Sequence, residues 1–122
     1  MKNPASDPHC RSNSRLVVWV VGLTILFELM TCVLRFGMQL ESTRDTASTI
    51  GLLTCGVRIH HSYIGGLIML AACWFWERFP RLAWWGLVLG LSLFLSDLIH
   101  HFLVLWPITG SPQFDLFYPI HA

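Results

Sequence analysis

Three blocks of apolar sequence dominate this chain and limit what it can fold into. Residues 16–40 contain two charged side chains, residues 82–106 contain one, and residues 62–76 contain none. About 20 apolar residues in a helix span the hydrocarbon core of a bilayer, so the first and third blocks are long enough to cross. The second block reaches this length if it extends back to Val57. The sequence therefore predicts an all-α integral membrane protein with about three transmembrane helices.

The composition argues against a soluble helical bundle. Hydrophobic residues make up 54% of the chain and charged residues 12%, whereas soluble domains contain about 25% charged residues. A basic start before an apolar run is also typical of a signal peptide, but this run is too long, contains Glu28 and is followed by no small-residue cleavage site. We therefore expect residues 16–40 to remain as a helix.

The segment between the second and third blocks predicts a helical hairpin. Residues 77–81 are few and include Pro80, which cannot continue a helix, so the flanking helices should run antiparallel. Residues 47–55 could form a short helix at the membrane interface. The expected organisation is a flexible cytoplasmic tail at 1–15, a single three-helix transmembrane domain at 16–107 and an extracytoplasmic surface tail at 108–122.

The basic residues predict an orientation. One side of the expected bundle carries five of them and the opposite loop carries two: Lys2, Arg11, Arg15, Arg78 and Arg81 against Arg44 and Arg58. The positive-inside rule places the N-terminus in the cytoplasm and the C-terminus outside. Because no basic cluster is present, a nucleic-acid partner is not expected.

Two histidine pairs carry the strongest functional signal. His60 and His61 open the second expected helix, and His100 and His101 lie near the end of the third. Since His60 and His100 are each 20 residues from Pro80, both pairs should lie about 30 Å from the turn and face each other at one level.

Asp97 lies three and four positions before the second pair, so it shares a helix face with one or both imidazoles. A carboxylate at this depth costs several kcal/mol unless it is paired or binds an ion. Imidazole and carboxylate ligands suit copper, zinc or iron. We therefore predict a metal site at the extracytoplasmic end, with Asp97 as a ligand or as the group that orients a ligand histidine. The candidate residues are His60, His61, Asp97, His100 and His101.

Other polar residues have two open interpretations each. Ser62 and Tyr63 could donate hydrogen bonds to the site, or they could cap and pack the helix. Glu28 lies near mid-membrane on one stripe with Cys32 and Arg35. It could relay protons or bind a buried cation, or it could be neutral or paired with Arg35 and order helix packing.

Small residues on the second and third helices predict close packing between them. They are Gly65, Gly66, Gly86 and Gly90. The four cysteines are scattered without C-x-x-C spacing, so we interpret them as small apolar residues and not as a disulfide or thiolate metal framework.

The motif I-H-H-x-x-I-G, from Ile59 to Gly65, and the motif D-x-x-H-H, from Asp97 to His101, occur together in this chain. This combination resembles a pattern seen in small, uncharacterised prokaryotic integral membrane proteins. The resemblance covers about a third of the chain. It implies a location in a prokaryotic inner or cytoplasmic membrane and carries no particular activity.

Three functions remain open from the sequence. The first is a metal-handling or redox accessory subunit of a larger membrane complex. The second is an electron-transfer subunit in which one histidine from each pair ligates haem b. The third is a cofactor-free structural or assembly subunit. Nucleotide-binding and common hydrolase motifs are absent, which argues against a nucleotide-dependent enzyme. A metal with an open coordination position leaves catalysis open, although we do not expect it from this chain alone. The bilayer and either a larger complex or a homo-oligomer are the expected partners.

Overall fold

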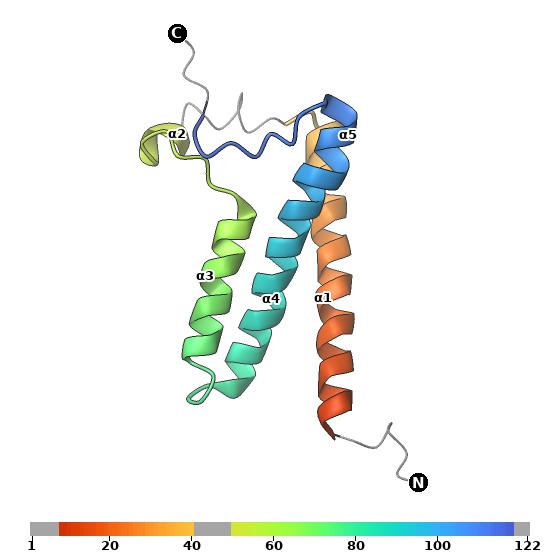
Figure 1. Ribbon diagram of the computed structural model, residues 1–122, viewed down its shortest axis with the longest axis vertical. Coiled ribbons are helices and arrows are strands. Elements are labelled where there is room, and N and C mark those ends of the chain that lie inside the picture. The colour runs from red at the N-terminus through yellow and green to blue at the C-terminus, as the bar shows by residue number, and fades with distance from the viewer. Residues whose placement is uncertain (1–7, 41–49, 119–122) are drawn as a thin grey trace.

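The computed structural model describes residues 8–40 and 50–118, and within them about three quarters of the residues are helical (Figure 1). The only β contact in this part of the chain is an isolated antiparallel bridge between Val57 and Phe117. The all-α prediction is confirmed. In chain order, with η marking π-helical stretches, the elements are α1 (Pro8–Cys32), η2 (Val33–Gly37), α2 (Ile50–Leu53), α3 (His61–Trp74), α4 (Pro80–Leu98), η4 (Ile99–Leu105) and α5 (Trp106–Thr109).

Two continuous helical segments are long and apolar enough to cross a membrane. They run over Asn13–Gly37 and Pro80–Thr109 and correspond to the first and third apolar blocks. The helix of the second block, α3, has 14 residues and is therefore about 21 Å long. It is shorter than the span that the sequence predicts.

Two boundaries differ from the sequence-based expectation. Residues 8–15 are helical and continuous with α1, whereas they were expected to belong to a flexible tail. The reason is that proline is tolerated in the first helical turn and no helix breaker separates Pro8 from the apolar run. The expected interfacial helix at 47–55 is seen only as α2, and residues 47–49 lie outside the described residues.

Helices α3 and α4 run antiparallel and cross at two glycines (Figure 1). A Cβ atom on Gly65 would lie 2.5 Å from the carbonyl oxygen of Gly90, and one on Gly90 would lie 2.7 Å from that of Gly65. Farther toward the turn, a Cβ atom on Gly86 would lie 3.2 Å from the Cβ of Ala72. Gly66, which was expected to share in this packing, has open space where its side chain would be. Three of the four glycines therefore let the two backbones approach.

Helix α1 packs against α4 on the side away from α3 (Figure 1). The buried Ser92 hydroxyl on α4 lies 2.7 Å from the Val88 carbonyl of its own helix and 3.3 Å from the Val20 carbonyl of α1. Nearer the start of α4, the ring of Trp85 meets that of Trp19 on α1 edge to face, with centroids 5.2 Å apart. A serine and an aromatic pair thus link α1 to the hairpin.

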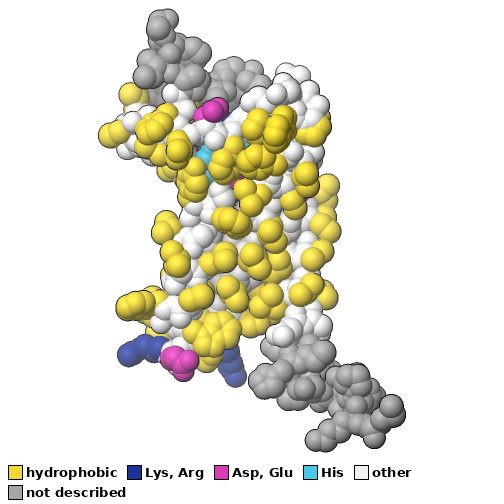
Figure 2. Space-filling view, in the orientation of Figure 1, with side chains coloured by type: hydrophobic (Ala, Val, Ile, Leu, Met, Phe, Trp, Pro, Cys, Tyr) yellow, Lys and Arg dark blue, Asp and Glu magenta, His cyan; other side chains and the backbone are white. Residues whose placement is uncertain are grey.

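The described residues are polar inside and apolar outside. Large hydrophobic side chains are exposed along α1, α3 and α4, and they cover the face seen in Figure 2, where the basic side chains gather below them at the α3–α4 turn. Soluble proteins bury most such side chains in a core. Nine buried residues are polar or charged: Thr24, Arg58, His60, Ser62, Ser92, Ser96, Asp97, His100 and His101.

The glycine crossing makes a direct prediction about stability. Gly65→Ala should destabilise the fold by about 1–3 kcal/mol, because its methyl group would overlap the backbone of α4. Gly66→Ala, one residue away, should be neutral or stabilising since alanine favours helix. Thermal unfolding in detergent measures both changes, and equal stabilities for the two variants would contradict the close helix crossing.

Candidate metal centre

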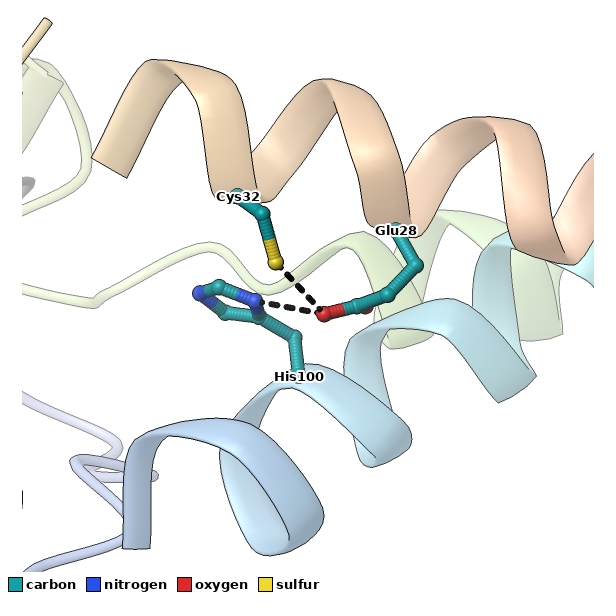
Figure 3. A group of neighbouring side chains, drawn as sticks. All are labelled: Glu28, Cys32 and His100. Carbon is teal, nitrogen blue, oxygen red and sulfur yellow. Dashed lines mark hydrogen bonds and ion pairs between the residues drawn. The ribbon is translucent and has the colours of Figure 1, made fainter. Parts of the chain in front are cut away.

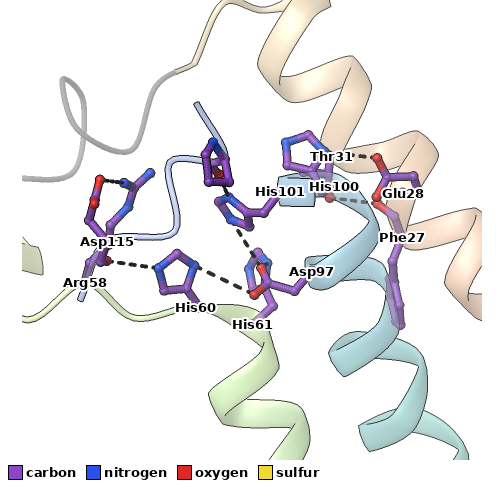
Figure 4. Close-up of polar contacts among 11 residues, drawn as sticks. Phe27, Glu28, Thr31, Arg58, His60, His61, Asp97, His100, His101 and Asp115 are labelled. Atoms are coloured by element: carbon purple, nitrogen blue, oxygen red, sulfur yellow. Dashed lines mark hydrogen bonds and ion pairs between the residues drawn. The ribbon is translucent and has the colours of Figure 1, made fainter. Parts of the chain in front are cut away.

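A compact polar cluster lies at the end of the hairpin opposite the α3–α4 turn. His60 immediately precedes α3, Asp97 lies in the last turn of α4, and His101 follows in η4 (Figure 4). All three residues are at least nine-tenths buried. One ligand atom from each of them lies within 4.8 Å of the others. One histidine of each pair, His60 and His101, therefore lies beside Asp97 in this cluster.

The histidine nitrogens approach the carboxylate without forming hydrogen bonds to it. His60 Nδ1 lies 3.7 Å from Asp97 Oδ2, and His101 Nε2 lies 3.7 Å from Asp97 Oδ1. These separations exceed hydrogen-bond length. Asp97 Oδ2 is buried and has no hydrogen-bond partner, a situation that costs a buried polar group about 1–3 kcal/mol.

Backbone carbonyls hold the opposite nitrogen of each ring. His60 Nε2 lies 3.2 Å from the Asp115 carbonyl oxygen, and His101 Nδ1 lies 2.7 Å from that of Pro112. A carbonyl oxygen only accepts, so these two nitrogens carry the hydrogens. In a neutral ring the other nitrogen then carries a lone pair and no hydrogen. In both rings this nitrogen points toward the buried carboxylate. Three electron-rich groups converge on one point.

The carbonyls belong to a C-terminal strap, residues 111–118, that crosses over the histidine end of the helices (Figure 1). The strap is hydrogen-bonded to the segment before α3, from Arg58 N to Leu116 O and from Tyr118 N to Gly56 O, both at 2.9 Å. The Arg35 guanidinium also reaches the Gln113 side chain at 3.5 Å. The sequence predicted only a surface tail here, because backbone contacts leave no residue signature.

Phe114 of the strap closes the cluster. Its ring stacks on His60 at 4.2 Å between centroids and meets His101 edge to face at 5.2 Å. Tyr63 adds an edge contact to His60 at 5.4 Å, and the Ser62 hydroxyl is buried without a partner. The aromatic contacts fix the His60 ring plane and shield it.

Arg58 ties the strap to the start of α3 by charge as well. Its guanidinium is buried and lies 4.0 Å from the exposed Asp115 carboxylate. Arginine remains protonated at neutral pH, so the ion pair persists. It holds Asp115, whose backbone carbonyl contacts the His60 ring.

The other histidine of each pair takes a different position. His61 Nδ1 lies 3.9 Å from Asp97 Oδ1, but the His61 side chain is 66% exposed. His100 is buried and turns toward α1, where its Nδ1 lies 3.0 Å from Glu28 Oε1. Consecutive residues on a helix point about 100° apart, so only His101 shares the face of Asp97. The roles of His61 and His100 as ligands stay predictions.

The geometry of His60, Asp97 and His101 fits a metal ion. Zinc holds nitrogen and oxygen ligands at about 2.0–2.2 Å in a tetrahedron, which separates neighbouring ligand atoms by about 3.4 Å. The two histidine nitrogens lie 3.7 Å from different oxygens of Asp97, and one ligand atom of each residue lies within 4.8 Å of the others. Histidines whose second nitrogen donates to a backbone carbonyl are also typical of metal ligands. The cluster could therefore hold a metal ion after small side-chain movements.

Comparisons with known proteins give no family to compare this geometry with. A scan against models of protein families and searches of curated proteins and of solved structures found no match.

The carbonyl contacts predict the tautomers of the metal-free protein. Neutral His60 should carry its hydrogen on Nε2, and neutral His101 on Nδ1, which is the less common form in solution. Nitrogen chemical shifts of the purified protein at pH above 8, after chelation, distinguish the two forms. If His101 carried its hydrogen on Nε2, the inward lone pair that the metal site requires would be absent.

Proposed function

We propose that this chain is an integral membrane protein with three transmembrane helices that binds a transition metal ion through His60, Asp97 and His101. The ion lies near the extracytoplasmic surface, under the C-terminal strap. In this proposal the protein is a metal-handling or redox accessory subunit of a membrane complex, and it is not an enzyme on its own.

The observation that carries the metal proposal is the convergence of two inward imidazole lone pairs on a buried carboxylate. Such an arrangement repels itself unless a proton or a metal cation is bound between the groups, because buried charge is stable only when it is paired or ligates an ion. A metal ion would satisfy the partnerless Asp97 Oδ2 and both lone pairs at once. Two histidines and one carboxylate suit iron and zinc, and imidazole also suits copper.

The distribution of side chains supports a membrane location. Apolar side chains face outward while hydroxyl, imidazole and carboxyl groups are buried between the helices, which is stable where lipid replaces water. The short helix α3 crosses together with the extended residues that precede it, and the bilayer thins locally to match. With the basic residues of the α3–α4 turn in the cytoplasm, the metal cluster lies on the opposite side.

The same geometry favours an ion over haem b. The ligand nitrogens of His60 and His101 both lie within 3.7 Å of the Asp97 carboxylate, and the Phe114 ring covers His60. A porphyrin bound between the two histidines would need the space that the carboxylate occupies. Three protein ligands around a small ion instead leave a coordination position for water or a further ligand.

Metal content tests the proposal. Protein purified in detergent after removal of any affinity tag should contain stoichiometric zinc, iron or copper by elemental analysis. Asp97→Asn keeps the side-chain shape but removes the anionic ligand, so it should lose the ion held by His60 and His101. His61→Ala should retain it, because the His61 side chain is mostly exposed.

Stability and the visible spectrum complete this test. Free metal at 100 times the dissociation constant of this site should add about 2.7 kcal/mol to the stability of the wild type, and this increment should be absent from Asp97→Asn. A folded wild type that binds no metal would contradict the proposal and leave the cofactor-free subunit. An intense Soret band in the absorption spectrum would instead show that the histidines ligate haem.

The role of the strap predicts a second effect. Phe114→Ala should weaken metal binding at this cluster about 10–100-fold, as removal of groups that orient metal ligands generally does. Phe117→Ala is the matched control, because Phe117 lies on the same strap with its ring exposed. Metal-binding titrations of the two variants measure the difference. Equal affinities would mean that the strap does not order the site.

A further inference from the structure

A second group of metal-ligating side chains lies between α1 and η4, on the other side of the histidine pair (Figure 3). It consists of Glu28, Cys32 and His100, whose ligand atoms lie within 4.8 Å of one another. Glu28 and Cys32 are one helical turn apart on α1, and His100 faces them from η4. No atom of this group belongs to the cluster around Asp97.

One carboxylate oxygen carries the contacts of this group. His100 Nδ1 lies 3.0 Å from Glu28 Oε1, and the Cys32 thiol donates to the same oxygen at 3.3 Å. The other oxygen, Glu28 Oε2, is buried and has no hydrogen-bond partner. The carboxylate is thus crowded on one side and unsatisfied on the other, although a buried carboxylate normally uses both oxygens.

We propose that Glu28, Cys32 and His100 form a second metal site, which takes a thiophilic divalent ion such as zinc. Thiolate ligands select such ions over magnesium and calcium. Ions of this kind accept thiolate, imidazole and carboxylate together, at about 2.0–2.3 Å. The side chains of this group lie close enough to reach one ion with small rotations.

The charge balance of this site suits its surroundings. On binding, the Cys32 thiol releases its proton to solvent, and the His100 hydrogen moves from Nδ1 to Nε2 so that Nδ1 can ligate. The thiolate and the Glu28 carboxylate then neutralise the two charges of the ion. A neutral complex avoids the cost of placing net charge between membrane helices, and it would also satisfy Glu28 Oε2.

The π-helical geometry explains why two sites lie side by side. Stretches of π-helix inside α-helices occur frequently at functional sites, and η4 begins between Asp97 and His100. The rings of His100 and His101 lie nearly perpendicular with centroids 5.7 Å apart, and His100 faces Glu28 whereas His101 faces Asp97. One histidine of the pair thus serves each cluster, and this second site stands on contacts independent of the first.

Cobalt substitution separates the two sites. The full chain is purified in detergent under reducing conditions, stripped with a chelator and titrated with Co²⁺ while the absorption spectrum is recorded. A thiolate ligand gives an intense ligand-to-metal band in the near ultraviolet, whereas a site of two histidines and one aspartate does not. We expect this band in the wild type and in Asp97→Asn, and its loss in Cys32→Ser.

Two further variants complete the experiment. Cys73→Ser is the matched cysteine control and should keep the band, because Cys73 is exposed on α3. Glu28→Gln, which keeps the side-chain size, should lower the Co²⁺ affinity measured from this band by at least about 10-fold. A wild type without a Cys32-dependent band would overturn the second site. That result would not affect the first site, because the first site is tested separately, by the loss of metal from Asp97→Asn.

Discussion

The organisation of this protein depends on one electrostatic conflict, the approach of two imidazole lone pairs to the buried carboxylate of Asp97. Backbone carbonyls of the C-terminal strap create the conflict in the neutral rings, because they accept the hydrogens of the outer nitrogens of His60 and His101, so that the inner nitrogens carry lone pairs. A cation at the centre converts this repulsion into three favourable bonds. The strap, the stacked Phe114 and the ion pair of Arg58 with Asp115 then act together, since each keeps a ring nitrogen directed at the same point.

The helices form a frame that holds the side chains of His60, Asp97 and His101 around that point. Gly65 and Gly90 bring the α3 and α4 backbones into contact, and Ser92 connects α4 to α1. In the proposed bilayer such contacts matter more than apolar burial, because lipid is as apolar as the side chains themselves. The polar interior then follows from a chain that exposes many large apolar side chains and whose buried ionisable groups gather at one end.

Much of the frame could be predicted from the sequence, and the reasons are physical. Long apolar blocks specify helices, and the equal spacing of His60 and His100 from Pro80 brings both histidine pairs to one end of a hairpin. Helix rotation could not be predicted, because apolar residues surround every helix and no polar face marks the inside. For this reason the pairing of Glu28 with His100 was unforeseen. The carbonyl contacts of the strap were also missed, since any residue type can supply a carbonyl.

The most direct test of the metal centre is X-ray absorption at the edge of the bound metal, measured on Cys32→Ser protein so that only the Asp97 site contributes. Our account predicts a first shell of nitrogen and oxygen atoms alone, at about 2.0–2.2 Å, with the outer-shell scattering of two imidazole rings. An absence of metal from this variant, or a shell without imidazole scattering, would contradict it.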